Sequence, residues 1–225
     1  YPEKNVLLIR KEEQVLIPCG IPYIFGTVGS PENNLIPDTA LTQNKIDLLI
    51  DEVRGLDRAK GEVNTSRGET IAYDRLILAT GSLPAMPPIP GFELGNVFPV
   101  HKDVAHLRNM QNALKGVSDL VIIGGGFIGV EFADECKKCT GANVSIVEML
   151  PHCLILAYDD EFCIHAEELL QERGVIPMTN TKVKRLVGKN TVEGVELENG
   201  ITVPAQTVIV GIGAAANVVL AERAG

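Results

Sequence analysis

The feature that most constrains the fold is a glycine-rich run in the middle of the chain, Gly124-Gly125-Gly126-Phe127-Ile128-Gly129. It follows the apolar segment 120–123 and precedes a helical pattern that Gly141 ends. A second apolar run, 144–147, comes next, so the whole unit has about the ~30 residues of one βαβ crossover. This order predicts two parallel strands joined by a helix, within a Rossmann-like α/β fold.

The glycine spacing in this run is typical of a dinucleotide-binding turn. Gly124 would permit the tight turn, Gly126 would let the backbone approach a pyrophosphate, and Gly129 would allow the helix to pack closely. Glu148 lies 19 positions after Gly129, at the end of the second strand, where its carboxylate would accept hydrogen bonds from an adenosine ribose. Because that carboxylate repels a 2′-phosphate and Met149 offers no positive charge, NADH is favoured over NADPH. A glycine-rich turn that binds no ligand is the alternative interpretation.

The rest of the chain has the organisation of one to two domains, at ~150 residues per domain. Residues 1–99 are β-rich and end in a proline-rich extended connection at 84–91, residues 100–213 form the βαβ region, and residues 214–225 follow as a short return segment. After the βαβ unit we expect a helix that begins at Asp159 or Asp160, with Phe162, Ala166, Leu169 and Leu170 on one face. Further strands are expected at 5–9, 46–53, 62–64, 70–73, 75–79, 182–187, 191–197, 201–203 and 207–212.

Composition excludes several classes of protein. The net charge is −9 and aromatic residues make up 4%, which disfavours a surface that binds nucleic acid or an anionic membrane. No run of apolar residues approaches the ~18 needed for a membrane span. With five cysteines and no signal peptide in the sequence, we expect reduced thiols and a cytoplasmic protein.

One cysteine is placed differently from the others. Cys19 lies in the rigid turn Pro18-Cys19-Gly20-Ile21-Pro22-Tyr23, where a thiol is accessible and could act as a nucleophile, although a small packing residue is the other interpretation. The pair Cys136 and Cys139 is interpreted as packing, because the carboxyl end of a helix opposes a thiolate. No metal site is expected, and His101 and His106 are interpreted as surface or loop residues.

Four motifs in order carry a resemblance to a known family. They are Cys19-Gly20-Ile21-Pro22-Tyr23, the stretch 73–82 that contains Ala79-Thr80-Gly81, Pro88-Ile89-Pro90-Gly91, and the stretch 123–131 around the glycine run. Together they resemble the single-cysteine pyridine nucleotide-disulfide oxidoreductases, which include NADH oxidases, NADH peroxidases and coenzyme A-disulfide or polysulfide reductases. The resemblance covers nearly the whole chain.

The resemblance implies a set of site residues. Cys19 would be the redox cysteine, Phe127 the aromatic that covers the flavin, and Glu131 a carboxylate near the nicotinamide. The NAD-binding residues would be Gly124, Gly126, Phe127, Ile128, Gly129, Glu148 and Gly211, and the FAD-binding residues Pro18, Cys19, Ala79, Thr80 and Gly81. As alternatives, Phe127 could simply pack at the start of the helix, and Glu131 could be an acid favoured by the helix dipole.

The chain also departs from the family pattern. It begins beyond the family's first glycine motif, which holds FAD, and it ends before the dimerisation domain, so we expect a fragment with an NAD(P)H-binding domain (100–213) inserted in a partial FAD-binding domain (1–99). Where the family places an acid for the FAD ribose, this chain has Arg10-Lys11-Glu12-Glu13. Alanines 214–216 replace the usual Arg-Pro before Asn217.

The function that the resemblance implies is an FAD-dependent NADH oxidoreductase. Electrons would pass from NADH through FAD to Cys19, and then to a disulfide, polysulfide, peroxide or oxygen acceptor, in a homodimeric parent enzyme. Two alternatives stay open: an NADH-binding module without turnover, and a rubredoxin-reductase or nitrite-reductase type of flavoprotein that uses a protein partner and needs no cysteine.

Overall fold

The computed structural model describes residues 3–225, and the chain divides into two compact units. The larger unit contains residues 16–34 and 84–215. The smaller unit contains the chain up to Val15, residues 35–83 and the C-terminal residues 216–225. The larger unit is therefore inserted, in two stretches, into the chain of the smaller one.

A five-stranded sheet forms the centre of the larger unit, and all of its strands are parallel. In spatial order the strands are β12 (Val175–Met178), β11 (Asn143–Val147), β10 (Asp119–Ile123), β16 (Thr207–Val210) and β9 (Val97–Pro99). Strands β10, β11 and β16 are almost entirely buried, which agrees with their continuous apolar sequences. The parallel strands expected on either side of the glycine run are confirmed.

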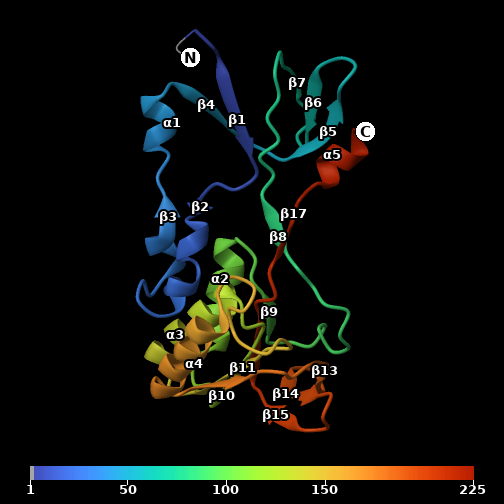
Figure 1. Ribbon diagram of the computed structural model, residues 1–225. Coiled ribbons are helices and arrows are strands. Elements are labelled where there is room, and N and C mark those ends of the chain that lie inside the picture. The colour runs from blue at the N-terminus through green and yellow to red at the C-terminus, as the bar shows by residue number, and fades with distance from the viewer. Residues whose placement is uncertain (1–2) are drawn as a thin grey trace. The chain divides into compact units, whose positions relative to one another are not determined.

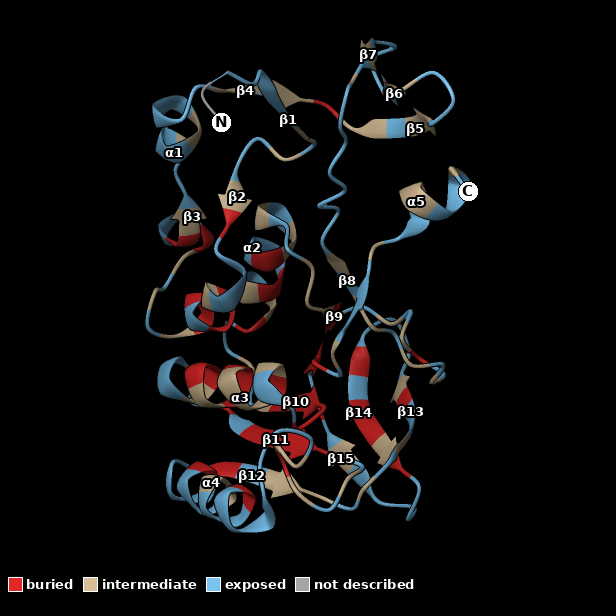
Figure 2. Cartoon of the chain, turned by 45° about the horizontal axis from the view of Figure 1, so that its top comes forward, coloured by how far each residue is buried: buried red, intermediate tan, exposed pale blue. Residues whose placement is uncertain are grey.

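Three helices belong to this unit: α2 (Val104–Ala113), α3 (Phe127–Cys139) and α4 (Asp160–Glu172). The Asp159 side chain caps α4 by accepting a hydrogen bond from the Phe162 N–H at 3.0 Å. Helix α3 packs on β10 and β11 (Figure 1), and α4 packs beside β12 (Figure 2). The crossover between parallel strands is thus helical, as the sequence pattern predicts.

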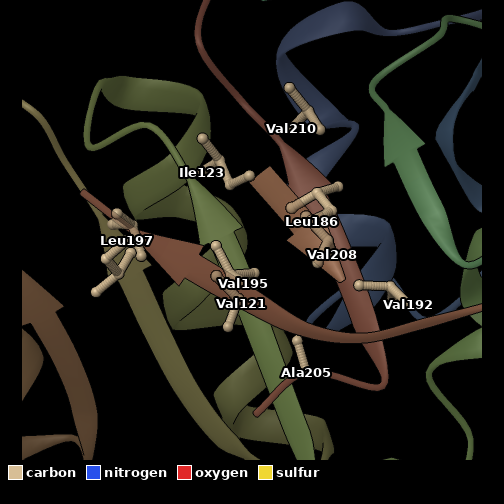
Figure 3. Close-up of a cluster of buried hydrophobic side chains, with 10 residues drawn as sticks. Val121, Ile123, Leu186, Val192, Val195, Leu197, Ala205, Val208 and Val210 are labelled. Carbon is tan, nitrogen blue, oxygen red and sulfur yellow. The ribbon is translucent and has the colours of Figure 1, made fainter. Parts of the chain in front are cut away.

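The other face of the parallel sheet is covered by an antiparallel meander of β13 (Val183–Gly188), β14 (Val192–Leu197) and β15 (Thr202–Pro204). Alternate residues of the central strands, among them Val121, Ile123 and Val208, point into a buried cluster with Leu186 and Val195 of the meander (Figure 3). Period-two alternation therefore sends one set of side chains to the meander and the other, including Ile122, to the helical layer.

Residues 16–34 also belong to the larger unit. They form three short 3-10 turns, η1 (Pro18–Gly20), η2 (Pro22–Phe25) and η3 (Pro31–Asn34). η2 lies on α3 and η3 lies on α2, with Ile24 and Phe25 buried. From the sequence these residues are expected to belong with 1–99, but in the structure their packing partners are the helices α2 and α3.

The smaller unit contains two small sheets. β1 (Val6–Arg10) pairs in parallel with β4 (Ile46–Ile50), and β5 (Val53–Asp57), β6 (Glu62–Thr65) and β7 (Thr70–Ala72) form an antiparallel meander. Two short helices accompany them, α1 (Thr39–Gln43) and α5 (Val219–Arg223), of which α5 packs on β5. At the end of β1 the Arg10 guanidinium makes a bidentate pair with Asp38, at 2.7 and 2.8 Å.

Four very short strands lie where the chain passes between the units: β2 (Val15–Leu16), β3 (Leu35–Ile36), β8 (Ser82–Pro84) and β17 (Ala214–Ala216).

Within residues 3–225, none of the helices has the length and apolar character needed to cross a membrane.

Several expectations from the sequence are wrong in detail. Residues 75–79 form no strand, and Leu76, Ile77 and Leu78 are exposed, because no described strand of their unit lies beside them to pair with. His106 is not a loop residue, since it lies on α2 and its Nε2 is 2.8 Å from the Pro99 carbonyl. On α4, Phe162 and Leu169 are exposed, while Cys163 and Leu170 form the buried face together.

The contrast in burial generates a prediction about local stability. Residues 6–8 of β1 are between 36% and 45% exposed, whereas Leu120 and Ile122 of β10 are at most 1% exposed (Figure 2). A two-stranded sheet is marginal by itself, so we expect amide hydrogens of β10 and β11 to exchange at least about 100-fold more slowly than those of β1. Hydrogen exchange with peptide resolution measures this, and equal protection of β1 and β10 would contradict it.

Candidate active site

The glycine turn lies at the carboxyl ends of β10, β11 and β16. Gly124 has φ of +104°, a conformation that other residues rarely adopt, and its N–H donates to the Val147 carbonyl at 2.9 Å. A Cβ atom at this position would lie 2.7 Å from the carbonyl oxygen of Gly211, the residue that follows β16. Gly124 is therefore required by both its dihedral angle and its contact with the neighbouring strand end.

The remaining predicted glycines differ in whether contacts within the protein leave room for a side chain. At Gly129 a Cβ would collide with the Gly124 carbonyl oxygen, and at Gly211 it would lie 3.2 Å from the Gly129 nitrogen, so helix and strand ends touch backbone to backbone. At Gly126, by contrast, a Cβ would meet no atom of the described residues within 4 Å. Gly126 is also the N-cap of α3, where the first backbone N–H groups have no partner within the helix.

Glu148 directly follows β11 and is buried, with 8% of its surface exposed. Its Oε2 accepts a hydrogen bond from the Gly125 N–H at 2.5 Å, and its Oε1 accepts one from the Leu150 N–H at 2.7 Å. The carboxylate thus ties the end of β11 to the glycine turn, a structural role that the sequence analysis does not anticipate. Each oxygen keeps a further lone pair, so an additional acceptor role remains available.

The loop after Glu148 is fastened to the same turn. The Leu154 N–H donates to the Gly125 carbonyl at 2.8 Å, and Glu167 of α4 accepts from the Cys153 N–H at 2.7 Å and contacts His152 Nδ1 at 3.2 Å. Sequence reasoning missed Glu167, because an acid on a helix gives no local signal of the loop it will contact. These bonds fix the loop after Glu148 next to the glycine turn.

Phe127, Ile128 and Glu131 occupy the first turns of α3. The Phe127 ring is 53% exposed and lies edge-on to Tyr158 with 5.8 Å between ring centroids, while Ile128 is half-buried. Burial raises the pKa of Glu131, and the charge of Glu135 on the next turn adds to the shift. An exposed aromatic and a carboxyl group that holds its proton more tightly than usual thus share the start of one helix.

Cys19 lies in η1 of the larger unit and is exposed. Its neighbour Gly20 is required by packing, because a Cβ there would collide with the side chain of Asn34. Asn34 is 3% exposed and its Nδ2 donates to the Ile17 carbonyl at 2.9 Å. The hydrogen bond from Asn34 and its close packing on Gly20 therefore hold the turn that presents the thiol.

The remaining predicted flavin residues, Ala79, Thr80 and Gly81, belong to the smaller unit. Asn217 holds them: the Thr80 hydroxyl donates to the Asn217 carbonyl at 2.5 Å, and the Asn217 N–H donates to the Gly81 carbonyl at 2.9 Å. Gly81 has φ of +70°. Asn217 directly follows the alanines 214–216 of the return segment, and its contact with Thr80 is not identifiable from the sequence.

The other four cysteines divide by burial. Burial raises the pKa of the Cys136 and Cys153 thiols to about 12, and it also raises that of Cys163. Cys139 is exposed at the end of α3. Cys136 is buried against the unit's core, as the packing interpretation requires, and Cys139 is not.

Comparison with protein-family models identifies one match over residues 2–225, described as pyridine nucleotide-disulphide oxidoreductase. Among curated proteins, the chain is 29% identical to an NADH oxidase of Methanocaldococcus jannaschii, over 99% of this chain and 52% of that protein. It is 32% identical to an NAD(P)H sulfur oxidoreductase (CoA-dependent) of Pyrococcus abyssi, over 100% of this chain and 51% of that protein. The chain thus spans about half the length of the curated relatives it matches.

Solved structures give the same picture of the fold. An NAD-dependent persulfide reductase from A. fulgidus superposes with a TM-score of 0.91 and 28% identity, covering 100% of this chain and 44% of that chain. Putidaredoxin reductase, in its covalent complex with putidaredoxin, superposes with a TM-score of 0.86 and 28% identity, covering 99% of this chain and 55% of that chain.

The distribution of thiols predicts a labelling pattern. Alkylation proceeds through the thiolate, and a pKa near 12 leaves the Cys136 and Cys153 thiols almost fully protonated at pH 8. Both thiols are also buried and inaccessible to the reagent. We expect iodoacetamide to label Cys19 and Cys139 at least about 100-fold faster than those two. Peptide mapping after brief treatment of the folded protein checks this, with denatured protein as the control. Early labelling of Cys136 or Cys153 would contradict the assigned burial.

Proposed function

We propose, from the premise that the chain belongs to the pyridine nucleotide-disulphide oxidoreductase family, that it is the nucleotide-binding and cysteine-bearing part of an NADH-dependent flavoprotein oxidoreductase. The single observation that carries the NADH assignment is Gly126. Contacts within the protein require Gly124 and Gly129, but they leave the Cβ position of Gly126 open. Because Gly126 is also the N-cap of α3, a ligand that approaches the first N–H groups of the helix would account for a glycine at this position.

A dinucleotide fits the residues around this opening. Its pyrophosphate would meet the first N–H groups of α3 and the positive end of the helix dipole. Glu148 lies at the end of the neighbouring strand, the position from which a carboxylate accepts hydrogen bonds from a ribose. Phe127 and Glu131 follow on α3, on the side where the nicotinamide end of the molecule would extend.

Glu148 also supports NADH over NADPH. Its carboxylate is buried and shares the turn with Gly125, so a 2′-phosphate placed next to it would bring two negative charges together in a poorly solvated position. The neighbouring residues Met149 and Leu150 carry no compensating positive charge.

The proposed second cofactor is FAD, which when bound would accept a hydride from NADH and deliver the electron pair to sulfur. In the smaller unit, the turn Ala79-Thr80-Gly81 is hydrogen-bonded to Asn217 and is preceded by the exposed apolar residues 76–78. These features fit the edge of a large planar group. Arg10 cannot take the role of the acid that the family places near the FAD ribose, because it is a cation. Its guanidinium is also bound to Asp38, and we assign no flavin contact to it.

Cys19 would carry the electrons onward as a thiolate. Its sulfur would attack a disulfide or polysulfide R–S–S–R, forming a Cys19–S–S–R bond and releasing R–S⁻. Two electrons from the reduced cofactor and one proton would then restore the Cys19 thiolate and release R–SH. The exposure of Cys19 on a held turn supports this class of acceptor. A hydroperoxide R–O–O–H would instead transfer one oxygen atom to the thiolate, forming a sulfenic acid and releasing R–O⁻. The complex of putidaredoxin reductase with putidaredoxin favours a protein acceptor as the second candidate.

Substitution of Gly126 tests the observation on which the NADH assignment rests. Gly126→Ala adds a Cβ that meets no described atom of the protein but occupies the position where the pyrophosphate would lie. We expect unchanged thermal stability and an affinity for NADH at least about 10-fold weaker, equivalent to ~1.4 kcal/mol. Fluorescence titration of NADH measures the affinity. Gly141→Ala is the matched control, because its Cβ position is also open but lies after α3, and it should bind as the wild type does. Wild-type NADH affinity in Gly126→Ala would overturn the assignment.

Substitution of Glu148 tests the coenzyme preference. Glu148→Gln keeps an oxygen that can accept from the backbone but removes the negative charge, whereas Glu148→Ala would also release Gly125 and Leu150. We expect the ratio of the dissociation constants of NADPH and NADH to fall by about 10-fold, as expected when a like-charge repulsion of ~1.4 kcal/mol is removed. Titration with both nucleotides gives the ratio, and an unchanged ratio would contradict the proposed role.

A further inference from the structure

The segment that carries Cys19 is attached to the same helix that begins at the glycine turn. We refer to residues 18–27 as the cysteine segment. Its Phe25 ring contacts the Phe132 ring of α3 with 5.1 Å between centroids, and Ile24 is fully buried. Gln111 of α2 donates to the Ile24 carbonyl at 3.2 Å. The cysteine segment is thus packed on two helices of its own unit.

Glu135 makes a charged contact to this segment. Its side chain is 2% exposed, and its Oε2 accepts a hydrogen bond from the Thr27 backbone N–H at 2.7 Å. Gly26 fits the contact closely, because a Cβ there would collide with the same carboxylate and lie 2.6 Å from the Glu135 carbonyl oxygen. Burial alone would raise the pKa of Glu135, but the bonds from Lys138 and Thr27 outweigh it and lower the pKa, so the carboxylate stays ionised.

Ion pairing on the surface of α3 does not by itself account for this arrangement of Glu135. Lys138 bonds Glu135 at 2.7 Å, but it also pairs with Asp134 at 2.8 Å, and Asp134 pairs in turn with Arg173 at 2.7 Å. These two pairs of Asp134 do not involve Glu135. What Glu135 alone provides is an acceptor for the Thr27 N–H. Burying a carboxylate is costly unless its partners compensate, and here one of those partners is the cysteine segment itself.

We propose that Glu135 is a positioning residue that fixes the cysteine segment on α3 and thereby sets where Cys19 lies relative to the glycine turn of the same helix. Glu131 lies one helical turn before Glu135, and the glycine turn precedes Glu131 on the same element. One helix therefore connects the nucleotide-binding end to the cysteine segment. The functional meaning of this connection rests on the proposed function, but the positioning itself can be measured without turnover.

The test compares three variants of the 225-residue chain. Glu135→Ala removes the acceptor, Glu135→Gln keeps an acceptor oxygen without the charge, and Asp134→Ala is the matched control, which removes an acid from the same ion-pair group but does not contact the cysteine segment. The two readouts are the amide exchange of the cysteine segment and the rate of alkylation of Cys19 relative to Cys139, the second exposed thiol. The second readout is an internal ratio and does not depend on reagent concentration.

We expect Glu135→Ala to speed exchange of the Thr27 amide by at least about 10-fold and to raise the ratio of Cys19 to Cys139 labelling. Glu135→Gln should restore both readouts to near the wild-type values, and Asp134→Ala should leave them unchanged. Wild-type exchange and labelling in Glu135→Ala would overturn the proposal, and so would an equal effect of Asp134→Ala.

Labelling of the buried Cys136 or Cys153 would show that Glu135→Ala has unfolded, and Gly26→Ala then serves as the second variant. Its Cβ presses on the Glu135 carboxylate from the segment side, so it should raise the same labelling ratio, and an unchanged ratio would overturn the proposal. NADH titration of the wild type is a separate test, which addresses the proposed function alone. Absence of NADH binding would contradict the proposed function, while the exchange and labelling results would still decide the role of Glu135.

Discussion

The structure of the larger unit depends on one close approach of backbone to backbone. Gly129 at the start of α3, Gly124 at the end of β10 and Gly211 at the end of β16 lie so near one another that a Cβ on any of them would meet main-chain atoms of the others at 3.2 Å or less. This contact brings the first turn of the helix over the ends of the parallel strands. The first N–H groups of that turn have no partner within the helix, and they lie next to the open Cβ position of Gly126. The geometry suited to an anion is a consequence of the packing.

Other parts of the unit are organised around this turn. Glu148 connects the end of β11 to Gly125, and the loop that follows is bound to the Gly125 carbonyl through Leu154. Further along α3, Phe132 and Glu135 hold the segment that carries Cys19. The glycine turn lies at the start of α3 and the segment with the exposed thiol packs on the middle of the same helix, within one compact unit. The residues proposed to bind the reductant and the residue proposed to relay its electrons depend on the same packing.

The sequence predicted the local elements well where the pattern and its neighbours agree. The run 120–123, the glycine turn and the helix that follows are consistent in period, in glycine placement and in order, and the structure has them with bounds shifted by a few residues. Segment 75–79 failed because its apolar sequence is typical of a strand, but a strand also requires a partner, which local pattern does not reveal. Contacts between distant residues were also missed. Glu135 has the appearance of an ordinary acid on a polar helix face, and only the fold brings Thr27 to it.

The central claim is that the turn at Gly124–Gly129 binds NADH, and the most direct test is an amide chemical-shift titration of the isotope-labelled chain with NADH. The account predicts that the largest shifts fall on Gly125, Gly126 and Phe127, with smaller shifts at Leu150 and Gly211, because these backbone groups border the space beside Gly126. Absence of shifts at saturating NADH, or shifts confined to residues remote from this turn, would contradict it.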